Sequence, residues 1–250
     1  MLHVGLDLGG RKGSKTALCV LVDEENIAIG DVMILPKEGD EFIVDYLSGL
    51  DDLSTLSIDS PFQFPVCIRC EYDACPGVDA CENEVVSNIR EKSGNPYTQR
   101  LTEIILREKG MRPIETSALG QIVSRTIYLL KRLRKEGVSC SILEVYPRAS
   151  LLSIAQSKRF GSRKFEESCA KYKSPVSRVS HRSRQNILKR LSEAVSLSLF
   201  SEKLVENDDM FDSFLAAYTG CLFSRGLTIP MPPDHPSEDG WIVLPDPKKL

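Results

Sequence analysis

Three apolar, strand-compatible runs open the chain, at residues 2–8, 16–22 and 27–35. The sequence Asp-Glu-Glu-Asn at residues 23–26 provides a polar turn between the second run and the third. Strands joined by such short connections pair antiparallel, because a parallel pair needs a much longer crossover. The opening therefore commits the chain to a fold built on a β-sheet that begins with two or three antiparallel strands.

Strand and helix patterns alternate after this opening. Residues 53–58 and 139–145 are further apolar runs, each followed by a proline. Five segments have the character of helices: residues 41–50, 98–109, 117–136, 185–199 and 208–223. The proline-rich tail from residue 230 is expected to lie extended on the surface. This order favours a mixed sheet with helices on its faces, so we predict an α/β protein whose residues 1–250 form a single domain.

The composition is that of an ordinary globular protein. Hydrophobic residues make up 42% and charged residues 27% of the 250 residues. No run of 18 apolar residues appears, and the chain enters strand-like sequence at Leu2 without a basic and then apolar signal stretch. These features predict a cytoplasmic protein without a membrane-spanning segment, and they leave its oligomeric state open.

Acidic side chains stand where several of these elements end. Asp7, Asp59 and Glu144 each lie near the end of an expected strand. Asp209 and Asp212 are three residues apart in the last expected helix, so they lie near one another on the same side of it. Sites in open sheets form at strand ends, where the loops diverge and leave a crevice. We therefore expect these carboxylates to converge around a core of three, Asp7, Asp59 and Asp212.

Converging carboxylates repel one another unless cations lie between them. Hard divalent ions such as Mg²⁺ or Mn²⁺ prefer oxygen ligands, and two such ions can promote phosphodiester hydrolysis. The pattern thus predicts a metal-dependent catalytic site. Each carboxylate taken alone has a structural alternative, since Asp59 before Ser60-Pro61 suits a turn and Asp208 suits a helix N-cap.

Four short motifs carry a family resemblance, in this order along the chain: Val4-Gly5-Leu6-Asp7-Leu8-Gly9-Gly10, Ser57-Ile58-Asp59-Ser60-Pro61, Glu144-Val145-Tyr146-Pro147 and Asp209-Met210-Phe211-Asp212-Ser213-Phe214-Leu215-Ala216-Ala217. Together they resemble the motifs of an uncharacterised family of predicted nucleases with a ribonuclease H-like fold. The last motif is also similar to the closing helix of Holliday-junction resolvases of that superfamily, which carries two Asp residues three apart.

The resemblance implies a ribonuclease H-like mixed five-stranded sheet flanked by helices, together with catalysis by two metal ions. Carried over by position, Asp7, Asp59 and Asp212 would be metal ligands. Asp209 and Glu144 would be additional ligands or would orient water. The superfamily often has Glu at the mid-chain ligand position, and Asp59 is shorter than that residue.

Residues 61–96 form a proline-containing insertion that holds four of the eight cysteines: Cys67, Cys70, Cys75 and Cys81. In a chain without a secretion signal, clustered cysteines favour a metal over disulfides. Their compact spacing suits a [4Fe-4S] cluster, and a closed Zn²⁺ site is the nearest alternative. Unmetallated thiols are the third. We predict a metal centre that folds the insertion and shapes the rim of the carboxylate crevice.

Residues 158–190 are strongly basic, with 11 Lys and Arg against two Glu, although the net charge of the chain is -3. Such a segment can follow the phosphate backbone of DNA or RNA, or it can simply be a solvated face. Phe160, Phe165 and Tyr172 lie within it and are candidate stacking surfaces for exposed bases.

A glycine-rich turn follows the first strand at residues 9–15, and its Arg11 and Lys15 either cover a hairpin or contact substrate phosphate. Sugar kinases and actin-like ATPases also hold nucleotide phosphates on an Asp-x-Gly-Gly turn, but they duplicate a core that this chain shows once. The chain also lacks a P-loop lysine motif. Arg100 resembles another recurrent position of the nuclease family and would clamp a phosphate, with an exposed surface position as the alternative.

The leading hypothesis is a metal-dependent nuclease that hydrolyses phosphodiester bonds of DNA or RNA by a two-metal carboxylate mechanism. A nucleotide phosphohydrolase or phosphotransferase of related fold is one alternative. The other is a non-catalytic nucleic-acid-binding module with a metal centre formed by the four cysteines.

Overall fold

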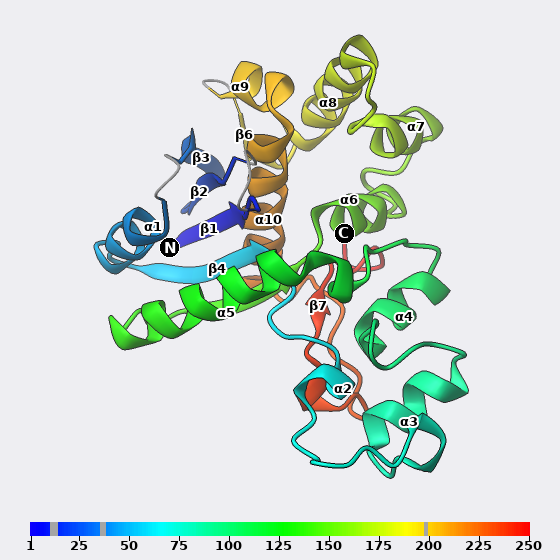
Figure 1. Ribbon diagram of the computed structural model, residues 1–250. Coiled ribbons are helices and arrows are strands. Elements are labelled where there is room, and N and C mark those ends of the chain that lie inside the picture. Colours follow the sequence, from blue (N-terminus) through cyan, green and yellow to red (C-terminus); the bar gives the residue numbers. More distant parts are fainter. Residues whose placement is uncertain (11–14, 36–38, 198–199) are drawn as a thin grey trace.

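Strand β1 (Leu2–Asp7) lies at the middle of a mixed sheet (Figure 1). It pairs antiparallel with β2 (Ala17–Asp23) and parallel with β4 (Leu53–Asp59). On the outer sides, β2 pairs antiparallel with β3 (Ile27–Ile34), and β4 pairs parallel with β5 (Ser141–Val145). The five strands expected from the sequence are therefore present. The computed structural model describes these residues: 1–10, 15–35, 39–197 and 200–250.

Two strands of two residues each extend the sheet at its edges and complete the order β6-β3-β2-β1-β4-β5-β7. β6 (Val195–Ser196) pairs parallel with β3, and β7 (Ile242–Val243) pairs parallel with β5. The described residues thus form a sheet of seven strands, and the expected number of five is wrong. β6 falls within a segment expected to be helical, and β7 within the tail expected on the surface. Two residues are too few to show a period, so only tertiary pairing defines these strands.

Helix α10 (Asp208–Ser224) crosses one face of the sheet over β1, β2 and β4. Glycines on both partners let the backbones come close together. A Cβ atom added at Gly5 would overlap the carbonyl oxygen of Ser213, and one at Gly220 would lie 2.5 Å from the Ser57 hydroxyl. The absence of side chains at these two positions therefore sets the distance between α10 and the sheet.

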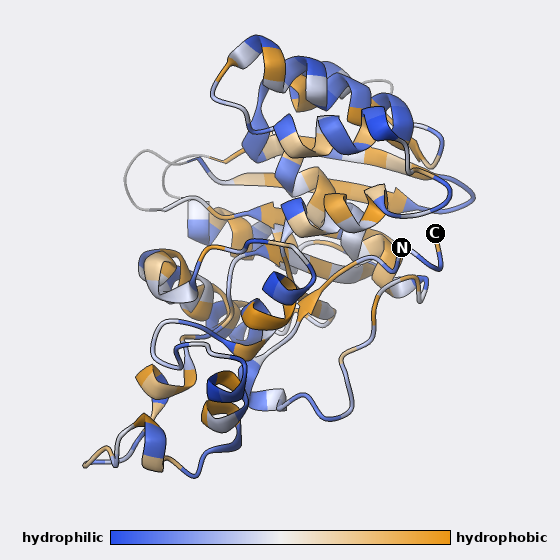
Figure 2. Cartoon of the chain, turned by 90° about the vertical axis from the view of Figure 1, so that its right-hand side faces the viewer, coloured by the Kyte–Doolittle hydropathy of each residue, from blue (hydrophilic) through white to orange (hydrophobic). Residues whose placement is uncertain are grey.

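Helices α1 (Gly39–Ser48) and α5 (Gly120–Lys135) cover the opposite face. Apolar side chains from the two helices and from the central strands form one core cluster: Val4, Leu6, Leu18, Val20, Leu56, Ile58, Ile43, Val44, Leu47, Leu129 and Leu133. Figure 2 shows hydrophobic residues concentrated in the strands and on the helix sides that face them. Because helices cover both faces, the central strands are continuous apolar runs without strict alternation.

The chain between β5 and α10 contains the helices α6 (Pro147–Ala155), α7 (Arg163–Lys171), α8 (Ser177–Leu191) and α9 (Ser201–Glu206). The basic segment at residues 158–190 is thus mostly helical, and the helix expected at residues 185–199 ends at Leu191. Phe160, Phe165 and Tyr172 are buried in the core that these helices share with α10. The prediction that they offer stacking surfaces to bases is therefore wrong.

The insertion at residues 61–96 extends away from the sheet together with the helix that follows it (Figure 1). It contains α2 (Val66–Arg69) and α3 (Glu84–Glu91), and α4 (Leu101–Glu108) comes next. A small core of its own holds these helices together: Val66, Val85, Val86, Ile89, Leu101 and Ile104. Short 3₁₀ helices complete the fold: η1 (Val78–Ala80), η2 (Thr116–Leu119) and η3 (Ser237–Asp239).

Within the described ranges, the chain has no helix with the length and apolar character needed to cross a membrane. α10 is apolar on most of its sides over its 17 residues. Its apolar side chains pack on the sheet and on neighbouring helices, so burial in the core accounts for its hydrophobicity.

Replacing Gly5 by alanine should lower the free energy of unfolding by about 3 kcal/mol, the upper end for overpacking a core. The added methyl group forces α10 away from β1. Urea denaturation followed by circular dichroism measures the loss. Gly49→Ala is the matched control, because a Cβ atom there meets nothing closer than 3.5 Å, and its stability should stay within about 0.5 kcal/mol of the wild type. Equal unfolding midpoints for the two variants would contradict the close contact.

Candidate metal-binding pocket

Asp7, Asp59 and Asp212 come together although they are far apart in the sequence. Asp7 ends β1 and Asp59 ends β4, and the parallel register of the two strands places these residues side by side. Asp212 lies in the second turn of α10, which crosses both strands. Each residue offers a carboxylate oxygen, and the three oxygens lie within 4.8 Å of one another. The predicted convergence of these three side chains is thus present in the structure.

Burial raises the pKa values of all three carboxylates, and repulsion within the cluster raises those of Asp7 and Asp59 further. Burial raises the pKa of Asp7 well above its ordinary value, and the neighbouring Asp59 and Asp212 raise it further. Burial and the nearby Asp212 raise the pKa of Asp59 to about 8. Burial also raises the pKa of Asp212, although Lys173 opposes this effect. The fold therefore disfavours negative charge on all three carboxylates at once unless a further cation compensates it.

Lys173 brings positive charge to the cluster from the connection between α7 and α8. Its Nζ atom forms an ion pair with Asp212. Burial lowers the pKa of Lys173, but attraction to Asp212 and Asp59 outweighs this effect and leaves the pKa raised. In the sequence, Lys173 is one of many basic residues at positions 158–190, and no local signal separates it from the others. Only the fold brings this connection to α10.

The buried carboxylate of Asp212 has the Lys173 ammonium group and the Tyr172 hydroxyl beside it, and hydrogen bonds from both side chains lower its pKa against the effect of burial. Among the described residues, neither carboxylate oxygen of Asp212 accepts a hydrogen bond of ordinary geometry. Buried polar groups of this kind destabilise a fold unless a ligand, ion or water satisfies them. Their presence at the meeting point of three carboxylates therefore indicates a binding site.

The carboxylates line a pocket of ≈ 300 Å³. The ends of β1, β4 and β5 form its floor, and α10, the start of α6 and the chain between α4 and α5 contribute to its walls. A pocket of this size, with polar groups converging from several elements, suits a small ligand or one unit of a larger one. Its polar and apolar lining residues include Asp7, Asp59, Arg100, Glu103, Arg112, Pro113, Ile114, Glu144, Tyr146, Arg148, Tyr172, Lys173 and Asp212.

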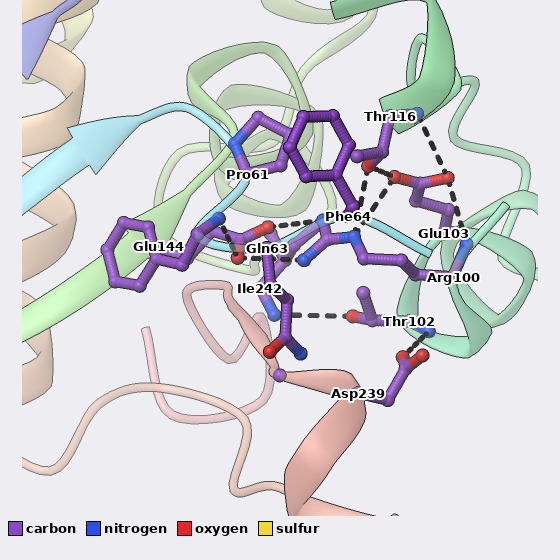
Figure 3. Close-up of polar contacts among 12 residues, drawn as sticks. Pro61, Gln63, Phe64, Arg100, Thr102, Glu103, Thr116, Glu144, Asp239 and Ile242 are labelled. Atoms are coloured by element: carbon purple, nitrogen blue, oxygen red, sulfur yellow. Dashed lines mark hydrogen bonds and ion pairs between the residues drawn. The ribbon is translucent and has the colours of Figure 1, made fainter. Parts of the chain in front are cut away.

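Glu144 and Arg100 both line this pocket and form an ion pair with each other (Figure 3). The two terminal nitrogens of Arg100 donate to the two carboxylate oxygens of Glu144 at 2.9 and 2.5 Å. Arg100 Nε donates to Glu103 at 3.3 Å, and the backbone N–H of Phe62 donates to Glu144 at 3.1 Å. The side chain of Arg100 is only 1% exposed. In this arrangement Glu144 is not free to bind a metal, and Arg100 is not free to clamp a phosphate.

Three further residues were predicted for the carboxylate site: Asp209, Lys15 and Arg11. Asp209 is half-buried, and burial and Asp208 raise its pKa, while Lys173 and Lys15 oppose the rise. It does not belong to the group of carboxylates whose oxygens lie within 4.8 Å of one another. Lys15 is exposed. Arg11 lies outside the described residues.

A second group of possible metal ligands, formed by His3, Asp23 and Cys221, is buried elsewhere in the described chain. Arg225 donates to the two oxygens of Asp23 at 2.6 and 3.1 Å, and the Cys221 thiol donates to it at 3.4 Å. The ring nitrogen Nδ1 of His3 lies 2.9 Å from the Thr55 hydroxyl. Because Arg225 already neutralises Asp23, this group connects β2 to the end of α10 as a structural network.

The four cysteines of the insertion are free thiols, with Cys70 and Cys75 exposed and Cys67 and Cys81 half-buried. Burial raises the pKa of Cys67, and the other three thiols raise it further, so all four lie within electrostatic reach. The backbone N–H of Gly77 donates to Cys75 Sγ at 3.4 Å. A tetrahedral zinc site holds its sulfurs ~3.8 Å apart, given a Zn–S distance of ~2.3 Å. Among the described residues, these thiols are not one of the groups of three or more possible ligands whose atoms all lie within 4.8 Å of one another.

Loss of one partner of the Arg100–Glu144 pair should destabilise the protein strongly. Glu144→Gln leaves a buried guanidinium without its bidentate partner and should cost about 3–5 kcal/mol in urea denaturation. The matched control is Glu167→Gln, whose Arg163 partner is 93% exposed and which should change stability by less than about 1 kcal/mol. Similar losses in the two variants would show that the buried pair has no special structural role.

Metal in the insertion should depend on its exposed cysteines. Protein purified without oxygen should contain iron with sulfide, or zinc, and the double variant Cys70→Ser, Cys75→Ser should lose that metal in elemental analysis. Cys140→Ser, outside the insertion, is the control and should retain it. Wild-type protein that carries neither iron nor zinc would identify the four groups as ordinary thiols.

Comparison with protein families covers nearly the whole chain. The model of a family described as "Protein of unknown function (DUF429)" matches residues 5–237, a range that includes Asp7, Asp59, Asp212 and the four cysteines of the insertion. Searches of curated proteins and of solved structures give no match to this chain. The chain belongs to the DUF429 family.

Proposed function

We propose that this chain is a nuclease of ribonuclease H-like fold that uses Mg²⁺ or Mn²⁺ to hydrolyse phosphodiester bonds of DNA or RNA. The observation that carries the proposal is the meeting of Asp7, Asp59 and Asp212, whose carboxylate oxygens lie within 4.8 Å of one another. Such a group is an oxygen-rich site of the kind that hard divalent cations prefer. The mixed sheet, with α10 packed across β1 and β4, supports the fold that the four sequence motifs imply.

The residues of the pocket fit a divalent cation. Neither oxygen of Asp212 accepts an ordinary hydrogen bond from the described residues, and the pKa of Asp7 is raised because burial and its neighbours disfavour another negative charge. A bound cation relieves both conditions. Asp7, Asp59 and Asp212 would hold it. When bound, such ions stabilise charge on a phosphoryl group and lower the pKa of water.

Lys173 has a different partner in the metal-bound protein under this proposal. In the structure its ammonium group neutralises Asp212, and its side chain is 43% exposed. When a cation compensates Asp212, Lys173 is free to contact a phosphate oxygen of the substrate. The side chain thus limits repulsion in the metal-free pocket and supplies preorganised positive charge to the bound phosphate.

A polyanionic substrate suits the surface formed by α7, α8 and the segments beside them. Exposed basic side chains gather there: Lys158, Arg159, Arg163, Lys164, Lys171, Arg178, Arg182 and Lys189. Lys173 belongs to the same segment and reaches the carboxylates. Cationic side chains attract a phosphate backbone without regard to base sequence. They therefore favour a nucleic acid over a small uncharged substrate.

The proposal predicts cleavage that requires Mg²⁺ or Mn²⁺ in a panel of single-stranded, duplex, hybrid and branched nucleic acids. Asp7→Asn should lower the rate by at least about 100-fold, because it removes a charged cation ligand. The control Asp45→Asn makes the same replacement of a carboxylate by an amide, but at an exposed position on α1, and should leave the rate unchanged. Isothermal titration with Mn²⁺ provides a readout that is independent of activity. Asp7→Asn should bind Mn²⁺ more weakly than the wild type, and Asp45→Asn should bind it equally well.

Other outcomes point to other functions. Cleavage by Asp7→Asn at the wild-type rate would overturn the assignment of the carboxylates. Turnover of ATP without nucleic acid would favour a phosphohydrolase or phosphotransferase. Binding of nucleic acid by wild-type protein, without cleavage in either metal, would favour a non-catalytic binding module.

A further inference from the structure

Two arginines in the wall of the carboxylate pocket have no hydrogen-bond or ion-pair partner among the described residues. Arg112 and Arg148 both line the pocket, and both are exposed. In the part of the chain that the structure describes, neither guanidinium group forms a hydrogen bond or an ion pair. Arg100 in the same wall differs from them, because Glu144 and Glu103 accept its hydrogen bonds. A structural role in an ion pair therefore explains Arg100 but does not explain Arg112 and Arg148.

The backbone holds both arginines in place at the pocket. Arg148 is the second residue of α6, which begins at Pro147 directly after β5. The first turn of α6 has no acidic residue and no side-chain cap, so its N-terminal end is electropositive. Arg112 lies in the connection between α4 and α5, and its carbonyl oxygen accepts a hydrogen bond from the Tyr146 hydroxyl at 3.3 Å. This bond connects the two segments that carry the arginines.

Apolar side chains lie beside these cations. Ile114 is 60% exposed, and it lines the pocket together with Pro113 and the half-buried Tyr146. An exposed apolar surface within a pocket of charged groups suits a ligand that is apolar on one face and anionic at one end. A nucleotide unit has this character, because its base presents a flat apolar face and its phosphate carries the charge.

We propose that the pocket binds one unpaired nucleotide next to the scissile phosphate, with the flanking phosphate on Arg112 and Arg148 and the base or sugar against Ile114. This inference rests on the proposed nuclease function and names the part of the substrate that is recognised. Guanidinium groups match phosphate oxygens in charge and geometry. A volume of ≈ 300 Å³ leaves room for roughly one nucleotide, since pockets for small ligands begin at about this size. The preferred substrate is therefore a single strand or a strand end, whose bases are free to leave the stack.

Binding of short nucleotides in Ca²⁺, without a need for cleavage, tests the inference. The probes are the dinucleotide TpT and the same dinucleotide with one additional phosphate at its 5′ or its 3′ end. Isothermal titration of the wild type should show at least about 10-fold tighter binding for one of the phosphorylated forms, as expected for a charge-assisted contact. Arg112→Gln with Arg148→Gln should abolish this preference. Arg134→Gln, an exposed arginine on α5 outside the pocket, should retain it.

The results of these and of further binding measurements distinguish the possible ligands of the pocket. Equal binding of all three dinucleotides by the wild type, or an unchanged preference in the double variant, would overturn the phosphate contact. Tighter binding of thymidine diphosphate than of any dinucleotide would overturn the inference, because the ligand of the pocket would then be a nucleotide polyphosphate and not a nucleic-acid strand. Fully paired blunt duplex should compete at least about 10-fold less well than a single strand. Equal competition would contradict the recognition of an unpaired base. If the preference depends on the two arginines but no nucleic acid is cleaved in Mg²⁺ or Mn²⁺, the proposed function fails while the phosphate contact stands.

Discussion

The close contact between α10 and β1 is the constraint on which the candidate site depends. Asp7 and Asp59 are neighbours because β1 and β4 pair in parallel with these two residues in register. Asp212 joins them only because Gly5 and Gly220 leave no side chains between the helix and the sheet. Without that approach the third carboxylate would lie farther from the strand ends, and two Asp residues alone would make a weaker cation site.

The pocket contains buried acidic groups in two different states. Glu144 is satisfied by two hydrogen bonds from Arg100 and one from the backbone of Phe62. Asp212 is equally buried, yet its contacts are an ion pair with Lys173 and the neighbouring Tyr172 hydroxyl, and neither of its oxygens accepts a hydrogen bond of ordinary geometry from the described residues. The oxygens of Glu144 are therefore occupied by protein donors, whereas those of Asp212 are still able to bind a ligand. This contrast separates the residues that hold the pocket together from those available to a cation.

Sequence patterns were informative where the signal is local. The strand ends carried Asp7 and Asp59, and the helical spacing placed Asp212 on the side of α10 that meets the sheet. Lys173, Arg112 and Arg148 could not be found in this way. Each is one basic residue among many, and a charge has no periodicity that indicates its partner. The burial of Tyr172 was missed for a related reason, since the surrounding basic residues gave its segment the composition of an exposed surface.

By itself, the sequence determined the mixed α/β character of the protein, its five main strands and the three acidic positions, because apolar periodicity and strand ends are properties of adjacent residues. Tertiary structure alone decided the edge strands β6 and β7, the pairing of Arg100 with Glu144 and the arrival of Lys173 at Asp212. These features join residues that are distant in the chain, and their energy comes from burial and charge pairing that exist only after the elements have packed.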